Sequence, residues 1–570
     1  MLEIRDLTLE VPGREGRRRL LDGVSAKFPL GHFAAVLGPS GCGKTSLLKA
    51  VCGIADGEES GGVFWKGRDL SEEDFSPSEI AYVPQFSTSY GELTVRESVE
   101  FAVRLRVGLE SRAVRSERVD GILEEVRLKE LEDRRVAVLS GGQRRRLALA
   151  LELTSRPEIL LCDEVTSGLD PRSEDEIVHL IRNLSRRHDR LVLSVTHSLE
   201  HLDLYDSVLV LHRGVAVYHG PPDLLAHYFR VDSADLLYER LEDRSPEEWA
   251  ASWKKHRDAL AEASRTLNPD TLSGRVAETG EESPAPLPGT ASQFATLLAR
   301  RFLVFSRCRS QILLQLGLIL GFPLLVAVFA WNGLPAVMSL GMGLDLDVVR
   351  QMNEAREFLL QSTKVGSLVS GIVMFQVILL TLMGANNSGR EIAAERAIFE
   401  KEKLAGLNPS AYVASKAVFL AVFVAAQSLW MGVFVHQVCG FPGNLGMQLV
   451  LLLMVNAAMT SICLGISSLM STAEQASLVS IYLVGFQLPL SGAVLALPEA
   501  LGGAVRPFIS AYWSWSGILQ TLKNERYYDI VQTVVQSPLS PLGLCVWVLA
   551  AHIAAGLFVA RIGCERRQAD

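Results

Sequence analysis

The sequence lacks the cysteine and histidine spacings that are typical of metal sites. Eight cysteines occur in 570 residues, and they include no CxxC pair and no His/Cys cluster at metal-ligand spacing. A thiol that falls within an apolar segment serves as a small hydrophobic filler. We therefore expect reduced cysteines, as in a cytosolic setting.

The sequence also lacks a basic patch or arm. Its net charge is −8 and its isoelectric point is about 5.9, whereas binding to a phosphate backbone requires clustered Lys and Arg. We therefore expect no nucleic-acid partner.

Hydrophobic residues make up 48% of the chain and the mean hydropathy is +0.22. Because the apolar residues are concentrated in the C-terminal half, these values indicate a membrane protein.

No internal repeat is evident, and the N-terminus has no long apolar stretch of the kind that a signal peptide carries. Residues 1–11 alternate apolar and polar side chains, which predicts a first β-strand. With a prior of about 100 to 200 residues per domain, a chain of 570 residues predicts at least two domains.

A complete phosphate-binding loop is present at residues 38–45 (GPSGCGKT), which match G-x-x-x-x-G-K-[ST]. The apolar residues 33–37 before it predict a buried strand, and residues 46–51 after it predict the start of a helix. In that setting successive backbone N–H groups point at phosphate oxygens, and the helix N-terminus adds a favourable field. Lys44 is predicted to reach the β- and γ-phosphates, and the Thr45 hydroxyl to bind Mg²⁺. A glycine turn with a solvated lysine is the alternative.

Two further segments supply polar groups for phosphoryl transfer. Gln85 ends residues 80–85 (IAYVPQ), and its amide is predicted to sense Mg²⁺ and the attacking water. Residues 159–164 (ILLCDE) predict an apolar strand that ends in two carboxylates. We predict that Asp163 binds Mg²⁺ through water and that Glu164 polarises the attacking water as general base. Capping of a helix is the alternative role of these acids.

A second anion site is predicted at residues 139–143 (LSGGQ), a turn that opens a helix. Its N–H groups and the Ser140 hydroxyl suit a phosphate, although an ordinary serine N-cap followed by a solvated face of arginines is the alternative. Residues 167–170 (SGLD) come next, and His197 follows the apolar run LVLSVT. An imidazole there is predicted to contact the γ-phosphate, unless the histidine is structural.

In this order the motifs resemble the phosphate loop, Q-loop, signature, Walker B, D-loop and H-loop of the ATP-binding cassette (ABC) family. The resemblance implies an α/β P-loop fold, ATPase activity with ATP and Mg²⁺, and cassettes paired head to tail, so that the signature of one chain closes on the ATP of the other. Val165 stands where the family usually has proline, and no aromatic residue lies near Val11 to stack on adenine. The catalytic residues are expected to be Glu164, His197 and Gln85, and the Mg²⁺ ligands Thr45, Gln85 and Asp163. The residues expected to bind ATP are Gly38, Pro39, Ser40, Gly41, Cys42, Gly43, Lys44, Thr45, Ser46, Ser140, Gly141, Gly142, Gln143 and Asp170.

The C-terminal half contains six long apolar runs, each near the roughly 20 residues that cross a bilayer. Basic residues before the first run, between the second and third, and after the sixth predict that these regions are cytoplasmic. We expect an all-α, six-helix transmembrane domain at residues 293–570, preceded by a cassette domain at 1–230 and by a helical extension and flexible linker at 231–292. The apolar runs are residues 312–331, 365–385, 413–438, 447–470, 476–497 and 539–560.

Three features of this half carry functional expectations. Residues 391–404 are amphipathic and charged, which predicts a segment that couples the cassette to the spans, with a plain surface helix as the alternative. The aromatic cluster Tyr512, Trp513 and Trp515 suits an outer membrane interface. Polar residues inside spans line a path or, more commonly, form interhelical hydrogen bonds. These residues are Gln376, Gln427, Asn456 and Gln487.

The order of cassette then membrane domain resembles the G-subfamily ABC half-transporters and their bacterial relatives. So do the stretches VYHGPPDLLAHYF after the histidine and REIAAERAIFEKEKLAGLNPSAYVASK between spans. The resemblance implies a multi-pass integral membrane protein with a cytoplasmic cassette, in the inner membrane if the protein is bacterial.

The same resemblance implies a dimer with a second half-transporter chain, either identical or different. It further implies ATP-driven outward movement of a small amphipathic or lipid-like substrate, with membrane lipid as a further partner. An ATP-driven mechanotransmitter that acts on a partner membrane protein and carries no cargo is the alternative. The exporter is favoured because the sequence shows no large periplasmic domain to receive force.

Overall fold

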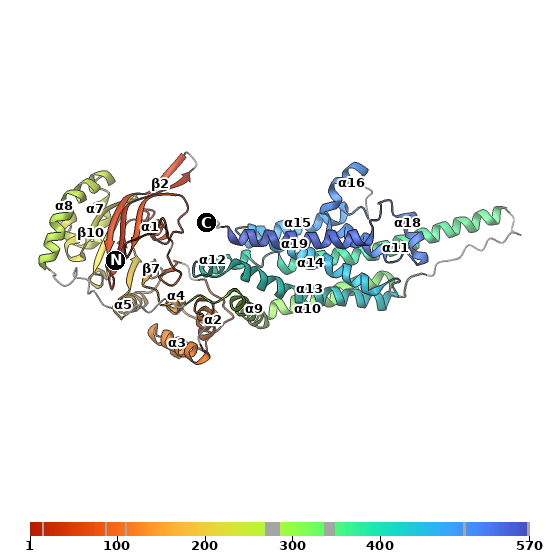
Figure 1. Ribbon diagram of the computed structural model, residues 1–570, viewed down its shortest axis with the longest axis horizontal. Coiled ribbons are helices and arrows are strands. Elements are labelled where there is room, and N and C mark those ends of the chain that lie inside the picture. The colour runs from red at the N-terminus through yellow and green to blue at the C-terminus, as the bar shows by residue number, and fades with distance from the viewer. Residues whose placement is uncertain are drawn as a thin grey trace. The chain divides into compact units, whose positions relative to one another are not determined.

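The computed structural model describes the chain except residues 14–15, 74, 86–87, 109–110, 188, 268–285, 336–347, 494–497 and 567–570. Two compact units are present: Met1–Ser292 with Lys401–Leu407, and Gln293–Glu400 with Asn408–Asp570. The first is an α/β domain and the second is helical (Figure 1). Most of the predicted flexible linker lies outside the described residues.

A six-stranded sheet forms the centre of the first unit. Its order is β10-β9-β3-β8-β7-β6, with all neighbours parallel except β10, which runs antiparallel to β9. The strands are short and largely apolar, as expected for a sheet that is covered on both faces. They are β3 (Phe33–Leu37), β6 (Ile80–Val83), β7 (Ile159–Asp163), β8 (Leu191–Val195), β9 (Ser207–His212) and β10 (Val215–Gly220).

A second, four-stranded antiparallel sheet has the order β2-β1-β4-β5. Its apolar side chains pack with helix α1 (Lys44–Val51) and with one face of the six-stranded sheet in a single buried cluster. The predicted first strand is β1. The strands of this sheet are β1 (Leu2–Gly13), β2 (Gly16–Phe28), β4 (Glu58–Trp65) and β5 (Arg68–Asp69).

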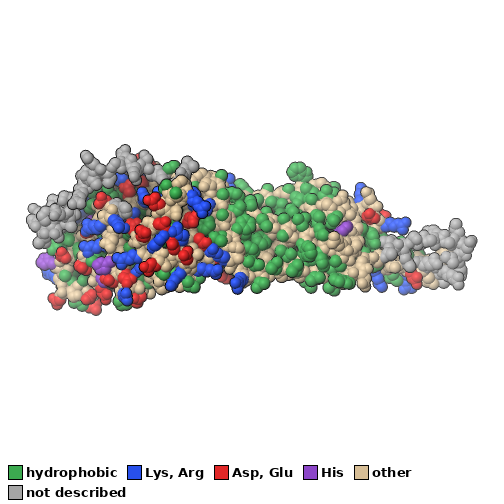
Figure 2. Space-filling view, turned by 90° about the horizontal axis from the view of Figure 1, so that it is seen from below, with side chains coloured by type: hydrophobic (Ala, Val, Ile, Leu, Met, Phe, Trp, Pro, Cys, Tyr) green, Lys and Arg blue, Asp and Glu red, His purple; other side chains and the backbone are tan. Residues whose placement is uncertain are grey.

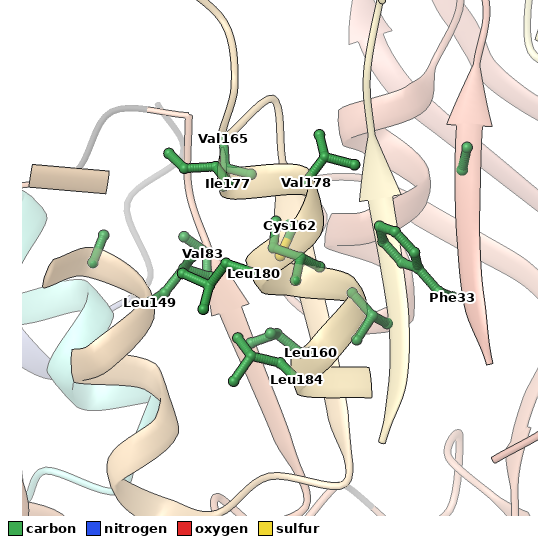
Figure 3. Packing of buried hydrophobic residues seen from close by; sticks show 14 of the residues in the cluster. Phe33, Val83, Leu149, Leu160, Cys162, Val165, Ile177, Val178, Leu180 and Leu184 are labelled. Atoms are coloured by element: carbon green, nitrogen blue, oxygen red, sulfur yellow. The ribbon is translucent and has the colours of Figure 1, made fainter. Parts of the chain in front are cut away.

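The other face of the six-stranded sheet is covered by helices. Side chains alternate between the two faces of the sheet along β3. Phe33 and Ala35 pack in a buried cluster with these helices, whereas Ala34 and Val36 pack in the cluster with the second sheet. Figure 3 shows Phe33, Leu160 and Cys162 on the strands facing the side chains of the neighbouring helix. The main helices of this layer are α2 (Val95–Arg106), α3 (Arg112–Glu125), α4 (Gly141–Glu152) and α5 (Pro171–Arg187).

Short elements and the 22-residue helix α8 complete the first unit. They connect the main helices and strands and build the helical extension after the last strand. These elements are η1 (Lys129–Leu131), η2 (Val136–Val138), η3 (Leu153–Ser155), η4 (Leu202–Leu204), η5 (Pro222–Leu224), α6 (Leu225–Phe229), η6 (Ala234–Leu236), α7 (Leu237–Leu241) and α8 (Pro246–Leu267).

The second unit is built from helices, and α14 (Leu445–Leu469) is its central element. It packs against α11 (Val348–Ser388), α13 (Pro409–Cys439), α17 (Ser510–Gln520) and α19 (Leu542–Glu565). The other elements are α9 (Thr290–Arg307), α10 (Arg309–Ala327), η7 (Val328–Ala330), η8 (Ala393–Glu395), α12 (Arg396–Leu404), α15 (Ala473–Leu490), α16 (Glu499–Val505), η9 (Arg506–Phe508) and α18 (Arg526–Val534).

Within the described residues, five helical segments are long and apolar enough to cross a membrane. Hydrophobic side chains cover the face of this unit that Figure 2 shows. Residues 476–490 of the predicted span 476–497 are helical as part of α15, which is not among the five, and residues 494–497 lie outside the described part of the chain. The number six therefore stays a prediction. The five segments are Arg309–Ala330, Gln351–Leu404, Pro409–Cys439, Leu445–Leu469 and Leu542–Glu565.

The aromatic cluster predicted for a membrane interface is buried instead. Tyr512, Trp513 and Trp515 lie on α17, where they are 2%, 7% and 0% exposed and belong to the core of the second unit. Each ring finds a polar partner for its hydrogen-bonding group, as Trp515 does by donating to the Ser370 hydroxyl at 3.2 Å. The expectation of an interfacial cluster was wrong because amphipathic rings also suit a core that offers partners to their polar ends.

Candidate nucleotide site

The phosphate-binding loop lies between β3 and α1, as its flanking residues predict. Gly38 and Gly43 have φ values of 151° and 104°, and a Cβ atom would meet the Leu211 carbonyl oxygen at 2.3 Å or the Leu20 carbonyl oxygen at 2.7 Å. Only glycine fits these two positions. No side chain caps α1 at Gly43, so the N–H groups of its first turn remain available to an anion.

Lys44 is buried within this loop, with 5% of its surface exposed. Its ammonium group donates to the carbonyl oxygens of Gly38 at 2.9 Å and Pro39 at 3.0 Å. Burial lowers the pKa of Lys44, although the nearby carboxylates oppose that shift. The alternative of a solvated lysine therefore does not describe this side chain.

Parallel topology brings the other predicted residues to the same edge of the sheet. Gln85 follows β6, Asp163 ends β7 with Glu164 directly after it, and His197 follows β8. The carboxyl ends of parallel strands meet at one edge, where open α/β sheets bind their ligands. Residues far apart in sequence therefore form one site.

Asp163 is held by two hydroxyl groups. Its Oδ1 accepts a hydrogen bond from Thr45 Oγ1 at 3.0 Å, and its Oδ2 accepts one from Tyr82 Oη at 2.9 Å. Burial raises the pKa of Asp163, and the charge of Glu164 adds to the rise, while the two hydroxyl groups oppose it. Because the Thr45 hydroxyl donates its hydrogen bond to Asp163, the lone pairs of its oxygen are available to bind a cation.

These oxygen donors fit Mg²⁺. The ion is usually held by one or two carboxylates, by water and by substrate phosphates rather than by a full protein cage. Accordingly, no group of three or more His, Cys, Asp or Glu side chains in the described part of the chain could hold a metal alone. Two of the predicted Mg²⁺ ligands, Thr45 and Asp163, are hydrogen-bonded to each other. The third, Gln85, donates a hydrogen bond to Glu164 instead.

Both carboxylate oxygens of Glu164 have partners from the predicted sensing residues. Gln85 Nε2 donates to Oε2 at 2.7 Å, and His197 Nε2 lies 2.7 Å from Oε1. The backbone of Glu164 has a φ of 46°, in the left-handed region that non-glycine residues rarely adopt. The structure therefore joins three residues that the sequence assigns to catalysis.

The signature residues form a helix cap. Ser140 is the N-cap of α4 and makes a reciprocal capping box with Gln143, with bonds of 3.3 Å and 3.0 Å. In the described residues no hydrogen bond joins residues 140–143 to the loop 38–45. The arginines that follow are not a solvated face, because Arg145 donates to the Gln85 carbonyl oxygen and Arg146 to Glu176.

Asp170 likewise acts as a cap. Its Oδ2 accepts a hydrogen bond from the Ser173 N–H at 3.0 Å in the first turn of α5. The nucleotide roles of Asp170 and of the signature residues stay predictions.

Two tyrosines near the site were not singled out from the sequence. One is Tyr82, described above. The other is Tyr238 on α7, whose hydroxyl donates to the His197 carbonyl oxygen at 3.4 Å. A lone tyrosine in a strand or a helix is common in protein cores, so neither position carried a signal.

The predicted coupling segment is not a plain surface helix. It comprises η8 and α12, and Glu395 and Phe399 are largely buried. Glu395 pairs with Lys416 at 2.5 Å, while Phe399 packs on the Tyr412 ring at a centroid distance of 4.3 Å. Its C-terminal end belongs to the first unit, in which Lys401 pairs with Glu152 at 2.7 Å. Its role in coupling stays a prediction.

Polar residues of the spans bond to one another. Gln427 on α13 donates to Gln315 at 2.9 Å and accepts from Asn387 at 2.9 Å and from Asn456 at 3.1 Å. These carboxamides come from four helices, α10, α11, α13 and α14. Gln487 accepts from the Ala511 N–H. For these residues the structure favours interhelical bonding over a path lining.

Comparison with protein families gives two matches along the chain. Residues 21–167 match the model described as ABC transporter, and residues 292–512 match the model described as ABC-2 type transporter. The chain therefore belongs to the ABC transporters, with an α/β P-loop cassette followed by a helical membrane domain, as the sequence predicts.

Individual relatives match nearly the whole chain or a part of it. The ABC transporter ATP-binding/permease protein Rv1747 of Mycobacterium tuberculosis (strain ATCC 25618 / H37Rv) is 28% identical over 558 residues, which cover 95% of this chain and 59% of that protein. The sulfate/thiosulfate import ATP-binding protein CysA of Vibrio vulnificus (strain CMCP6) is 35% identical over 230 residues, or 39% of this chain and 65% of that protein. The chain thus spans about three fifths of the length of these relatives.

Among solved structures, the chain is similar to the dimeric ATP-binding cassette MJ0796 in a post-hydrolysis state bound to ADP and Pi. The identity is 24% and the TM-score 0.36, with 39% of this chain and 99% of that chain covered.

Proposed function

We propose that this chain is an ABC half-transporter that couples ATP hydrolysis to the outward movement of an amphipathic or lipid-like substrate. The observation that carries the hydrolytic part is the position of Glu164. Its carboxylate is bonded to Gln85 and His197 and directly follows Asp163, which is bonded to Thr45 of the phosphate loop. Phosphoryl transfer needs phosphate contacts, a metal and an oriented nucleophile, and these residues with the phosphate loop offer groups that would hold each of them.

In the proposed site, ATP binds to the loop residues 38–46, with its phosphates on the N–H groups of α1 and on Lys44. Thr45 and, through water, Asp163 would hold Mg²⁺, which would supply positive charge to neutralise the charge that develops on the phosphates. Glu164 accepts the proton of the attacking water, while Gln85 and His197 orient that water and the γ-phosphate. Residues 140–143 and Asp170 complete the site of a second chain.

The transport part rests on the membrane unit. Its interior polar groups are mainly neutral amides and hydroxyls that bond to one another, and the face of the unit that Figure 2 shows is largely apolar. The carboxamides of the cluster around Gln427 carry no net charge, so the cluster offers no counter-ion to a strongly ionic cargo. We assign the cassette to residues 1–230, the extension and linker to 231–292 and the permease to 293–570. The cassette is placed in the cytoplasm, and the partner is a second half-transporter chain.

The test uses the full chain in liposomes that contain a fluorescent phospholipid. Chains whose cassettes face outward hydrolyse external Mg-ATP, so the labelled lipid is expected to move to the inner leaflet and become protected from a membrane-impermeant quencher. Glu164→Gln is the matched control for the chemistry, and Glu200→Gln, an exposed acid on the loop after His197, is the control for charge. Hydrolysis without movement of any of several amphipathic probes would contradict the exporter and favour the mechanotransmitter.

A further inference from the structure

Tyr82 makes a contact that none of the motifs requires. It lies on β6, the strand that pairs directly with β7, and its hydroxyl donates a hydrogen bond to Asp163 Oδ2 at 2.9 Å. The other oxygen of the same carboxylate accepts from Thr45 on α1 at 3.0 Å. Three separate elements therefore fix the orientation of one carboxylate.

The chemistry of this arrangement is specific. An ionised carboxylate accepts about four hydrogen bonds, and Thr45 and Tyr82 take one on each oxygen. The remaining lone pairs face directions that both donors determine. The Tyr82 ring packs against the core cluster between the two sheets, so its hydroxyl has little freedom to move.

We propose that Tyr82 is a positioning residue for magnesium, which holds the Asp163 carboxylate in the orientation that accepts hydrogen bonds from the water shell of the nucleotide-bound ion. This role rests on the proposed function, which supplies the Mg-nucleotide. Partners of this outer-shell kind typically change metal affinity by about 10- to 100-fold when they are removed. Tyr82 is thus expected to set the Mg²⁺ requirement of the cassette without contacting ATP.

The experiment measures equilibrium binding of a fluorescent ATP analogue to the full-length chain in detergent, first in EDTA and then over a range of Mg²⁺ concentrations. Tyr82→Phe removes only the hydroxyl. We expect its affinity for the analogue in EDTA to match that of the wild type. The Mg²⁺ concentration at which Mg²⁺ has half of its full effect on analogue binding should rise roughly tenfold. The matched control is Tyr218→Phe, which removes a buried hydroxyl that donates to the Pro221 carbonyl oxygen at 2.6 Å. It should shift neither quantity.

Three outcomes would overturn the role. The Mg²⁺ curve of Tyr82→Phe could overlay that of the wild type. Its affinity in EDTA could fall by the same factor as its affinity in Mg²⁺, which would mean that the hydroxyl supports the fold rather than the ion. A wild-type chain that binds the analogue without any response to Mg²⁺ would overturn the proposed function, and this role with it. Thermal unfolding of each variant shows that the compared chains are folded.

Discussion

At the scale of single residues, Glu164 combines an unusual backbone with an unusual set of partners. Its left-handed φ of 46° costs free energy, and residues with such strain cluster at functional sites. The backbone is fixed on both sides, since the Glu164 N–H donates to Val195 at 3.1 Å and its carbonyl accepts from Ser167 at 3.0 Å. The strand edge therefore aims this carboxylate at Gln85 and His197.

Glu164→Gln is the direct test of that assignment. The amide is nearly isosteric but cannot accept a proton from water, so ATP hydrolysis is expected to fall by roughly 100-fold or more, as for loss of a general base. Binding of the fluorescent ATP analogue should be retained. Lys44→Ala, by contrast, should weaken binding itself, because its ammonium group is predicted to contact the phosphates. Near-normal turnover by Glu164→Gln would show that another group is the base.

Glu152 gives a prediction about stability. Its carboxylate is buried and accepts from Arg106 at 2.9 Å and 3.2 Å, and Lys401 lies 2.7 Å away. Burial alone would raise the pKa of Glu152, but the charges of Arg106 and Lys401 outweigh it and lower the pKa below the usual 4.5. Removing one member of a buried ion pair leaves the other charge uncompensated and costs about 3 to 5 kcal/mol.

Glu152→Gln should therefore lower the unfolding temperature of the full chain at pH 7. Because the folded-state pKa is lowered, the stability that the carboxylate contributes is fully present above its unfolded value and is lost as the pH falls through the folded value. The difference between wild type and variant should accordingly narrow on acidification below about pH 4.5. Thermal unfolding at several pH values measures this difference in unfolding temperature. Glu130→Gln is the control, because Glu130 is exposed. Equal unfolding temperatures at pH 7 would contradict the role.

At the scale of secondary elements, helices α14 and α19 of the second unit pack closely against each other. A Cβ atom on Gly556 would meet backbone atoms of Ser461 and Ile462 at 2.4 Å to 2.6 Å, and one on Gly563 would meet Ser468 at 2.2 Å. Small residues at such crossings let helix backbones approach, which drives association where no water is expelled. Glycine here is required by packing rather than by backbone conformation.

Gly556→Ala is expected to force these two helices apart. Overpacking of this kind typically costs about 1 to 3 kcal/mol, so the variant should give less monodisperse protein in detergent and a lower unfolding temperature. Gly543→Ala in the same helix is the matched control, since nothing lies within 4 Å of the added methyl group. If both variants behave alike, the crossing does not depend on this contact.

The elements also show what the sequence could predict. The apolar strands β3, β7 and β8, the phosphate loop and most spans follow from local patterns, because burial and bilayer thickness impose periods and lengths on the residues. Interhelical hydrogen bonding of Gln427 was expected, but its partners could not be predicted, and neither could the contact of Tyr82, since these partners are as many as 112 and 81 residues away in sequence. Tyr512 was misplaced because composition does not distinguish a buried ring from an interfacial one.

At the scale of the whole molecule, one chain carries two predicted anion sites for one nucleotide. The loop 38–45 opens α1 and the turn 140–143 opens α4, and no hydrogen bond between them is present in the described residues. Each helix N-terminus attracts an anion. Two copies arranged head to tail would place the turn of one chain on the ATP held by the loop of the other, which uses both sites.

Mixed dimers test this arrangement. In a homodimer, Lys44→Ala alone or Ser140→Arg alone damages both composite sites, because each site takes its loop from one chain and its signature from the other. When the two variants are co-expressed with different tags and purified by both tags, each mixed dimer contains one site with both lesions and one site with neither. We expect part of the ATPase activity to return, to about half of the wild-type rate if the two sites act independently.

Mixed dimers of Lys44→Ala with Glu164→Gln are the control. Both lesions fall on the loop side, so each composite site keeps one of them and no ATPase activity should return. Recovery in the first pair alone would establish that sites are shared between chains, whereas full activity of a demonstrably monomeric wild-type chain would refute sharing.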